Sequence, residues 1–113
     1  MVRCYCCAIL CVLILMISSC GYSMNSLPEG ELLETYYSPN EQYVLRIYLV
    51  DGGATVDYAI RGELTDTDTG EIKNIYWNYH ENEATVIWQD DYTVIINDHT
   101  LNLPNDVYDF RAH

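Results

Sequence analysis

The chain has 113 residues, of which 17 are acidic and 5 are basic, so its formal net charge is −12 at pH 7. Nucleic acids and anionic lipid headgroups are bound through clustered Lys and Arg, and so strong an acidic excess argues against both as partners. The length suffices for one domain with a modest core and not for two.

An apolar run at the N-terminus indicates where the protein resides. After Arg3, residues 4–17 form a run of 14 residues without a charge, which ends in Ile17-Ser18-Ser19-Cys20. A helix needs about 20 apolar residues to cross a bilayer core, so this run suits an export signal. Counted as far as Cys20 the run has 17 residues, the lower edge for a span. A retained single-pass anchor is therefore the alternative.

The end of this run resembles the lipobox of bacterial lipoproteins, in which small residues precede a cysteine that becomes lipid-modified. The resemblance implies a signal peptide over residues 1–19, cleavage between Ser19 and Cys20, and lipidation of the Cys20 thiol. Two acyl chains, such as palmitate, suffice for stable anchoring. We therefore expect the protein at the extracytoplasmic face of the cell membrane, with the membrane as a partner through its lipid anchor.

All five cysteines belong to this segment or to its lipid site. Four would be removed with the signal peptide: Cys4, Cys6, Cys7 and Cys11. Their surroundings are uniformly apolar, so they are better explained as small hydrophobes than as a metal knuckle. Because Cys20 would be blocked by lipid, we expect no disulfide, thiol catalysis or cysteine metal site in the mature domain.

Residues 20–34 are interpreted as the lipidated cysteine and a flexible tether, and residues 35–113 as an acidic β domain. The tether is rich in Gly, Ser, Asn and Glu, with a turn signal at residues 28–30. About twelve residues of flexible coil would reach roughly 20 Å and hold the acidic domain clear of the membrane. Leu32 and Leu33 either start a short helix or pack onto the domain.

Alternating apolar and polar residues between turns indicate strands from residue 43 onward. The first expected strand, residues 43–50, is apolar on much of both faces. In the second, Arg61 and Glu63 face away from the apolar side, and Gly62 is a candidate bulge. The apolar side of this strand carries Val56, Tyr58, Ile60 and Leu64. Further strands are expected over residues 71–77, 84–88, 92–96 and 101–103. About six short strands after an N-terminal apolar signal helix predict a mainly β single domain, with an antiparallel sheet that is curled or sandwich-like.

Several segments together resemble a known family. They are SPNEQY, LVDGGATVDYAIRGEL, KNIYWNY, a W-x-x-x-x-T-V-x-I-N element beginning at Trp88, and LPNDVYDFR. In this order and spacing, over about residues 36–111, they resemble domain of unknown function 5412, a family of small, often lipid-anchored proteins of Gram-positive bacteria. The turn after Pro39 departs from the Asp-Gly expected there. The resemblance implies no activity, because the family has none established.

Catalytic patterns are weak in this chain. Ser23, Ser26 and Ser38 lie in the tether or a turn, and His80, His99 and His113 are scattered without metal-ligand spacing. The loop over residues 66–71 fails the EF-hand pattern at positions 5, 6 and 12, and is better explained as a hairpin turn with Gly70 at positive φ. We therefore expect neither an enzyme nor a cofactor. A small cell-envelope hydrolase using paired carboxylates is the alternative.

The best candidates for a partner surface are Trp77, Tyr79, His80 and Trp88. Large rings that can also form hydrogen bonds are typical of recognition surfaces, and alternation places Trp77 and Tyr79 on one face of a strand, with Tyr76 on the other. Packing in the core is the competing explanation. The expected function is a non-enzymatic binding or structural module, with an unknown envelope protein or glycan as partner. An inhibitor or immunity-like protein is a further alternative.

Overall fold

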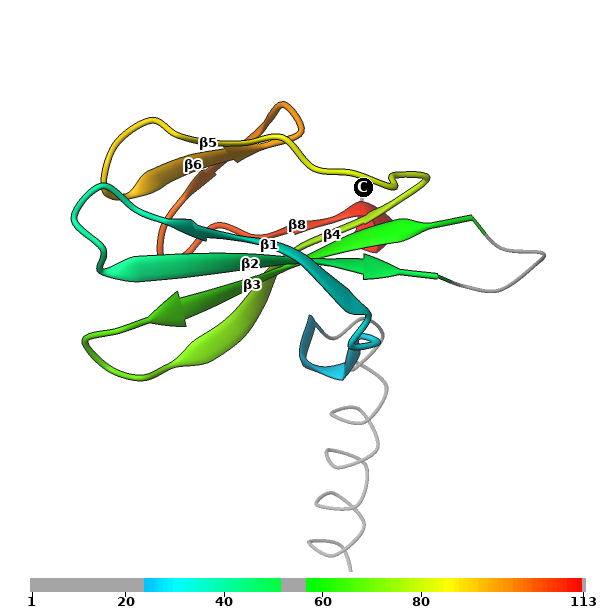
Figure 1. The fold of residues 1–113 in the computed structure, drawn as a ribbon, viewed down its shortest axis with the longest axis horizontal. Coiled ribbons are helices and arrows are strands. Elements are labelled where there is room, and N and C mark those ends of the chain that lie inside the picture. The colour runs from blue at the N-terminus through cyan, green and yellow to red at the C-terminus, as the bar shows by residue number, and fades with distance from the viewer. Residues whose placement is uncertain (1–23, 52–56, 113) are drawn as a thin grey trace, which may run out of the picture.

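Two sheets pack face to face in the computed structural model of the chain, which describes residues 24–51 and 57–112 (Figure 1). The predicted signal helix and the lipidation site Cys20 lie outside the described residues, as do Val56 and His113. Within the described ranges, no helix is long and apolar enough to cross a membrane.

The larger sheet has five strands in the order β1-β2-β3-β4-β8. Its strands are β1 (Glu31–Tyr37), β2 (Tyr43–Val50), β3 (Ala59–Asp66), β4 (Ile72–Tyr79) and β8 (Tyr108–Asp109). The first four strands are antiparallel neighbours, whereas β8 pairs parallel to β4. Antiparallel neighbours need only short connections, and the turn between β3 and β4 is closed by Gly70 at φ 77°, as predicted.

The smaller sheet is an antiparallel meander of β5 (Val86–Trp88), β6 (Thr93–Ile96) and β7 (His99–Asn102). Asn97 and Asp98 both have positive φ, 45° and 71°, and form the turn predicted between β6 and β7. Figure 1 shows this sheet above one face of the larger sheet. The prediction of a mainly β domain is thus confirmed, with eight strands in the described residues where about six were expected.

The two strands absent from the prediction are β1 and β8. β1 has the sequence ELLETYY, and most of its residues are exposed, so it shows no alternation between a buried and an exposed face. β8 has only two residues and pairs with a strand about thirty positions earlier in the chain. β1 is held by backbone pairing with β2 across a short turn, and β8 by pairing with the distant β4, and hydrophobic periodicity encodes neither pairing.

The main core lies between the two sheets, where the predicted alternation places the apolar residues of each strand. On β2, for example, Leu45 and Ile47 are buried on the core side, while Val44 and Val50 are buried on the other, as expected for a strand apolar on both faces. On β3 the expectation was wrong for Tyr58, which is 39% exposed just before the strand begins. The buried members of this core are Tyr43, Leu45, Ile47, Ile60, Leu64, Ile75, Tyr76, Val94, Ile96, Leu101 and Leu103.

Gly62 lies where β3 and β4 change register, which confirms the bulge predicted there. A Cβ atom at this position would lie 2.9 Å from Cβ of Tyr76, closer than two such atoms pack. The glycine therefore lets the fully buried Tyr76 ring lie against the backbone of β3. The Tyr76 hydroxyl donates to Oε1 of Glu81 at 2.8 Å, which satisfies it in the core.

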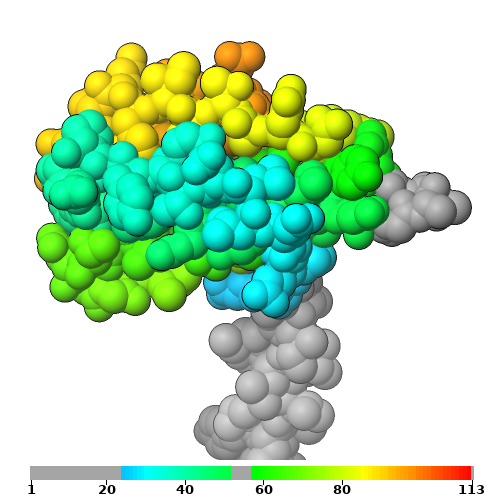
Figure 2. All heavy atoms as spheres, in the orientation of Figure 1, coloured from blue at the N-terminus to red at the C-terminus, as the bar shows by residue number. Residues whose placement is uncertain are grey.

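The opposite face of the larger sheet is covered by the N-terminal segment. A 3₁₀ helix, η1 (Met24–Ser26), precedes β1, and Met24 and Leu27 pack against a second apolar cluster that contains Trp77. In the space-filling view the blue N-terminal residues lie against the sheet (Figure 2). The flexible tether predicted over residues 20–34 is therefore folded onto the domain from residue 24, and the first strand begins at Glu31 rather than after residue 34. The polar composition of residues 20–34 did not indicate that Met24 and Leu27 pack onto the sheet.

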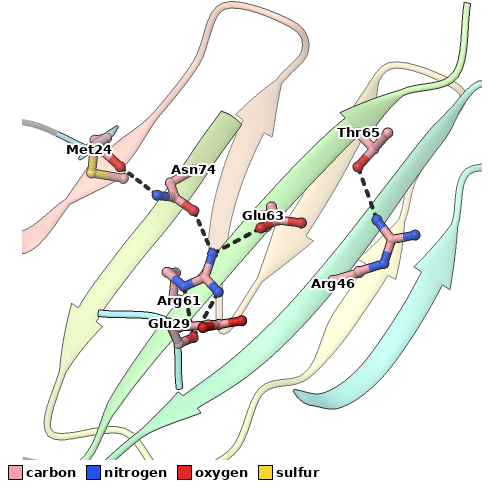
Figure 3. A network of polar contacts seen from close by, with 7 residues as sticks. All are labelled: Met24, Glu29, Arg46, Arg61, Glu63, Thr65 and Asn74. Atoms are coloured by element: carbon pink, nitrogen blue, oxygen red, sulfur yellow. Dashed lines mark hydrogen bonds and ion pairs between the residues drawn. The ribbon is translucent and has the colours of Figure 1, made fainter. Parts of the chain in front are cut away.

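A buried arginine holds the same segment in place (Figure 3). Nε and Nη2 of Arg61 donate to the carbonyl oxygen of Glu29 at 3.1 and 2.7 Å, and Nη1 donates to Oδ1 of Asn74 at 2.7 Å. Nη1 also lies 3.2 Å from Oε2 of Glu63, and the guanidinium carbon lies 4.0 Å from the Tyr48 ring centroid. Arg61 faces the side of β3 that was predicted, but the N-terminal segment leaves it only 5% exposed.

Candidate functional site

The predicted partner surface is divided by the fold. Trp77 and Tyr79 lie on one face of β4 and His80 follows them, whereas Trp88, on β5, packs against the main core on the other face of the larger sheet. Trp77 is only 8% exposed, so its ring belongs to the second cluster and is not available to a partner. The indole Nε1 of Trp88 is buried with no hydrogen-bond partner in the described part of the chain. The four residues therefore do not form one surface.

Tyr79 and His80 remain near the surface, beside a residue that the sequence did not single out. The Tyr79 ring stacks on Phe110, at the start of η2 (Phe110–Ala112), with ring centroids 5.8 Å apart. Nδ1 of His80 lies 2.8 Å from Oδ2 of Asp57, and this hydrogen bond is the main cause that lowers the pKa of Asp57. Both partners are largely exposed, so the pair orders the chain around β4 and offers no enclosed site.

We expect Trp77→Ala to lower the free energy of unfolding by about 3 kcal/mol, because it empties a nearly buried aromatic site in a small cluster. The measurement is urea denaturation of the full-length protein. Ile72→Ala is the matched control, since Ile72 lies on the same strand with 61% of its surface exposed, and it should change stability by no more than about 1 kcal/mol. An unchanged midpoint for Trp77→Ala would contradict its assignment to the core.

A pocket of about 250 Å³ lies at the other end of β4, six residues or roughly 20 Å from Tyr79. Strand neighbours form its floor, since Tyr43 of β2 pairs with Asp66 of β3, and Leu64 of β3 pairs with Lys73 of β4. The loop after β7 forms another wall. The lining residues are Tyr43, Leu64, Asp66, Thr69, Glu71, Lys73, Pro104 and Asn105.

Tyr43 contributes an unusual hydroxyl to this pocket. The residue is only 3% exposed, and its side chain has no hydrogen-bond partner among the residues that the structure describes. Burial, and then the carboxylates of Asp66 and Asp68, raise its pKa. The hydroxyl therefore stays protonated at neutral pH and can donate a hydrogen bond to a ligand.

The charged side chains of the pocket differ in how far they are already engaged. Oδ1 of Asp66 accepts from the backbone N–H of Asp68 at 2.9 Å, which supports the hairpin turn. Nζ of Lys73 donates to the carbonyl oxygen of Pro104. The carboxylate of Glu71 is exposed and forms no hydrogen bond or ion pair within residues 24–51 and 57–112. The pocket thus presents two carboxylates, one ammonium group and one hydroxyl.

Groups for nucleophilic or metal chemistry are not brought together in the described residues. The Ser38 hydroxyl is buried, donates to Oδ1 of Asn40 at 2.9 Å and accepts from the backbone N–H of Tyr43 at 3.0 Å. It therefore caps a turn. The His99 ring stacks on Tyr108, 3.9 Å between centroids. Within the described ranges, no three His, Cys, Asp or Glu side chains are grouped so that they could hold a metal ion.

Sequence reasoning missed the pocket as a site. The sequence pattern indicates Asp66 and Glu71 only as turn residues and Tyr43 only as a strand residue. Pro104 and Asn105, which complete the pocket, lie about thirty residues beyond Lys73 in the chain. No local pattern joins these segments, so the signal was present only as separate polar residues near two turns.

Comparison with known proteins gives one match. A family described as a family of unknown function, DUF5412, matches residues 1–113. No curated protein and no solved structure matches the chain.

Proposed function

The chain belongs to DUF5412, a family of unknown function, and we propose that it is a lipid-anchored binding module at the outer face of the bacterial membrane. The match is to an uncharacterised family and not to an enzymatic one. The proposal has two parts, the anchor and the binding function, and each rests on separate residues.

The anchor part rests on Cys20 and on the packing of the residues that follow it. The sequence Ile17-Ser18-Ser19-Cys20 follows a 14-residue apolar run, as in a lipoprotein signal. Four residues later, Met24 begins the segment that packs on the larger sheet. An extended chain spans at most about 14 Å over that distance. A lipidated Cys20 would therefore hold the domain close to the membrane surface.

The binding part rests on one observation, a polar pocket whose carboxylates remain open to water. The carboxylic acid that protonates the leaving group in a hydrolase is typically enclosed in an apolar pocket, but Glu71 is exposed and Asp66 is only half-buried. The Tyr43 ring belongs to the core, so it offers no aromatic platform for a sugar. These features favour a site that holds a ligand over one that cleaves it.

We expect Cys20→Ala to abolish incorporation of a palmitate analogue and to leave an unprocessed precursor in the membrane fraction. The thiol is the atom that the lipid would modify, so its removal should stop both processing and labelling. Cys11→Ala, within the apolar run, is the matched control and should still be labelled. If the wild-type protein takes up no label, the lipid anchor is refuted and a retained single-pass anchor takes its place.

A further inference from the structure

The charges of the pocket are arranged in two places. The backbone N–H of Asp66 donates to the carbonyl oxygen of Glu71 at 2.9 Å, so the two acidic residues stand side by side at the end of the hairpin. Lys73 is two positions further along the same chain and lines the same pocket. Two residues of extended strand cover about 7 Å. The pocket therefore has acidic residues and a basic residue, and the backbone positions of Glu71 and Lys73 lie about 7 Å apart along the strand.

Acidic and basic side chains in one pocket match a small molecule that carries both charges. In an extended dipeptide, the terminal nitrogen and the terminal carboxyl carbon are separated by about 6–7 Å, since one peptide unit spans 3.8 Å. In a single amino acid the two groups share one carbon and lie much closer together. The pocket volume of about 250 Å³ lies below the range of about 300–1,000 Å³ typical of sites for drug-sized ligands, so it suits a molecule of about dipeptide size.

The hydroxyl of Tyr43 supplies the second line of argument. It has no hydrogen-bond partner among the described residues and does not belong to their fully buried polar atoms, so it can donate to a molecule in the pocket. Tyr43 lines the same pocket as Asp66, which is the first carboxylate that raises its pKa. A ligand atom that accepts from this hydroxyl would replace water as its partner.

We propose that this pocket binds a dipeptide-sized zwitterion in extended form. Its ammonium group lies against Asp66 and Glu71, its carboxylate accepts from Nζ of Lys73, and a carbonyl oxygen accepts from the Tyr43 hydroxyl. Lys73 has three N–H donors and gives one to Pro104, so two remain for the ligand. The proposal rests on the binding function given above and adds the chemical class of its ligand.

The test uses the full-length protein in detergent micelles, titrated with alanylalanine and followed by NMR. N-acetyl-alanylalanine lacks the ammonium group, and alanylalanine amide lacks the carboxylate, so each analogue removes one end. We expect alanylalanine to bind at least about tenfold more tightly than either, because each end contributes a charge-assisted hydrogen bond. Equal affinity for one analogue would overturn the zwitterion, and absence of binding by the folded protein would overturn the pocket as a site.

Variants of the pocket residues test the contacts to the two ends of the ligand separately. Lys73→Met should weaken alanylalanine binding about tenfold and leave the affinity for alanylalanine amide unchanged, whereas Glu71→Gln should weaken both. Tyr43→Phe should weaken all three ligands while the spectrum of the folded protein is retained. If Lys73→Met lowers the affinity for the amide as much as that for alanylalanine, the proposed orientation is wrong.

The same spectra distinguish failure of this proposal from failure of the proposed function. Signals of free alanine would show that the protein cleaves the probe, which would refute a non-enzymatic role while leaving the zwitterion site in place. Binding without release of alanine supports both. Labelling of Cys20 does not depend on the pocket, so the anchor is judged independently of these titrations.

Discussion

Ile60→Asp should leave the protein unfolded under native conditions. Ile60 is 0% exposed between the two sheets, and an unpaired carboxylate there costs several kcal/mol. A domain of this size has a total stability on the order of 5–15 kcal/mol, of which one such change removes a large part. Val94→Asp should act in the same way from the smaller sheet, since Val94 is also 0% exposed.

The measurement is the far-UV circular dichroism and the NMR dispersion of each full-length variant. Ile87→Asp is the matched control, because Ile87 lies on β5 and is 53% exposed. It introduces the same side chain in place of isoleucine, yet should change stability by no more than about 0.5 kcal/mol. A folded Ile60→Asp protein with native dispersion would show that the space between the sheets is not a tightly packed core.

Arg61→Ala should lower the free energy of unfolding by about 3–5 kcal/mol, the usual cost of breaking a buried, hydrogen-bonded charge network. The substitution leaves the carboxylate of Glu63 and the amide of Asn74 without their main partner (Figure 3). It also frees the carbonyl oxygen of Glu29, so the N-terminal segment should detach from the sheet. Urea denaturation measures the first effect, and limited proteolysis within residues 24–34 measures the second.

Arg46→Ala is the matched control for this prediction. Nη1 of Arg46 donates to Oγ1 of Thr65 at 3.0 Å, and its side chain is only partly buried on the neighbouring strand. The Arg46→Ala substitution removes the same charge from the same sheet, but should lower the free energy of unfolding by only about 1 kcal/mol. The N-terminal segment should stay protected from proteolysis. Equal losses for the two variants would mean that the effect is one of net charge and not of the Arg61 network.

The Arg61 network also determines how far the N-terminus can be truncated without loss of stability. The sequence suggested that the folded domain starts near residue 35. Because Met24 and Leu27 cover Trp77, and Glu29 accepts from Arg61, removal of residues up to 31 would expose an apolar cluster and remove two hydrogen bonds of the Arg61 guanidinium. The sequence did not indicate that the domain begins before residue 35, since polar and turn-forming residues surround Met24 and Leu27.

Local periodicity determined most of the strands. β2, β3, β4 and the meander β5 to β7 were all expected from alternating residues and turn signals, and Gly62 and Gly70 were assigned their conformational roles from type and position alone. The family was also recognisable from segments in order, and the match over residues 1–113 confirms it. These features are local because side-chain period and turn chemistry act over a few residues.

The tertiary structure alone decided what each face packs against. Alternation placed Trp77 and Tyr79 opposite Tyr76, but it did not show that Met24, Leu27 and Phe110 would cover Trp77. Alternation also gave no indication that Lys73 and Pro104 lie together, although both line the pocket. A strand's sequence specifies which residues share a face, whereas the partner of that face comes from elements far along the chain. The contacts of that face are therefore set by tertiary packing and not by the spacing of residues in the sequence.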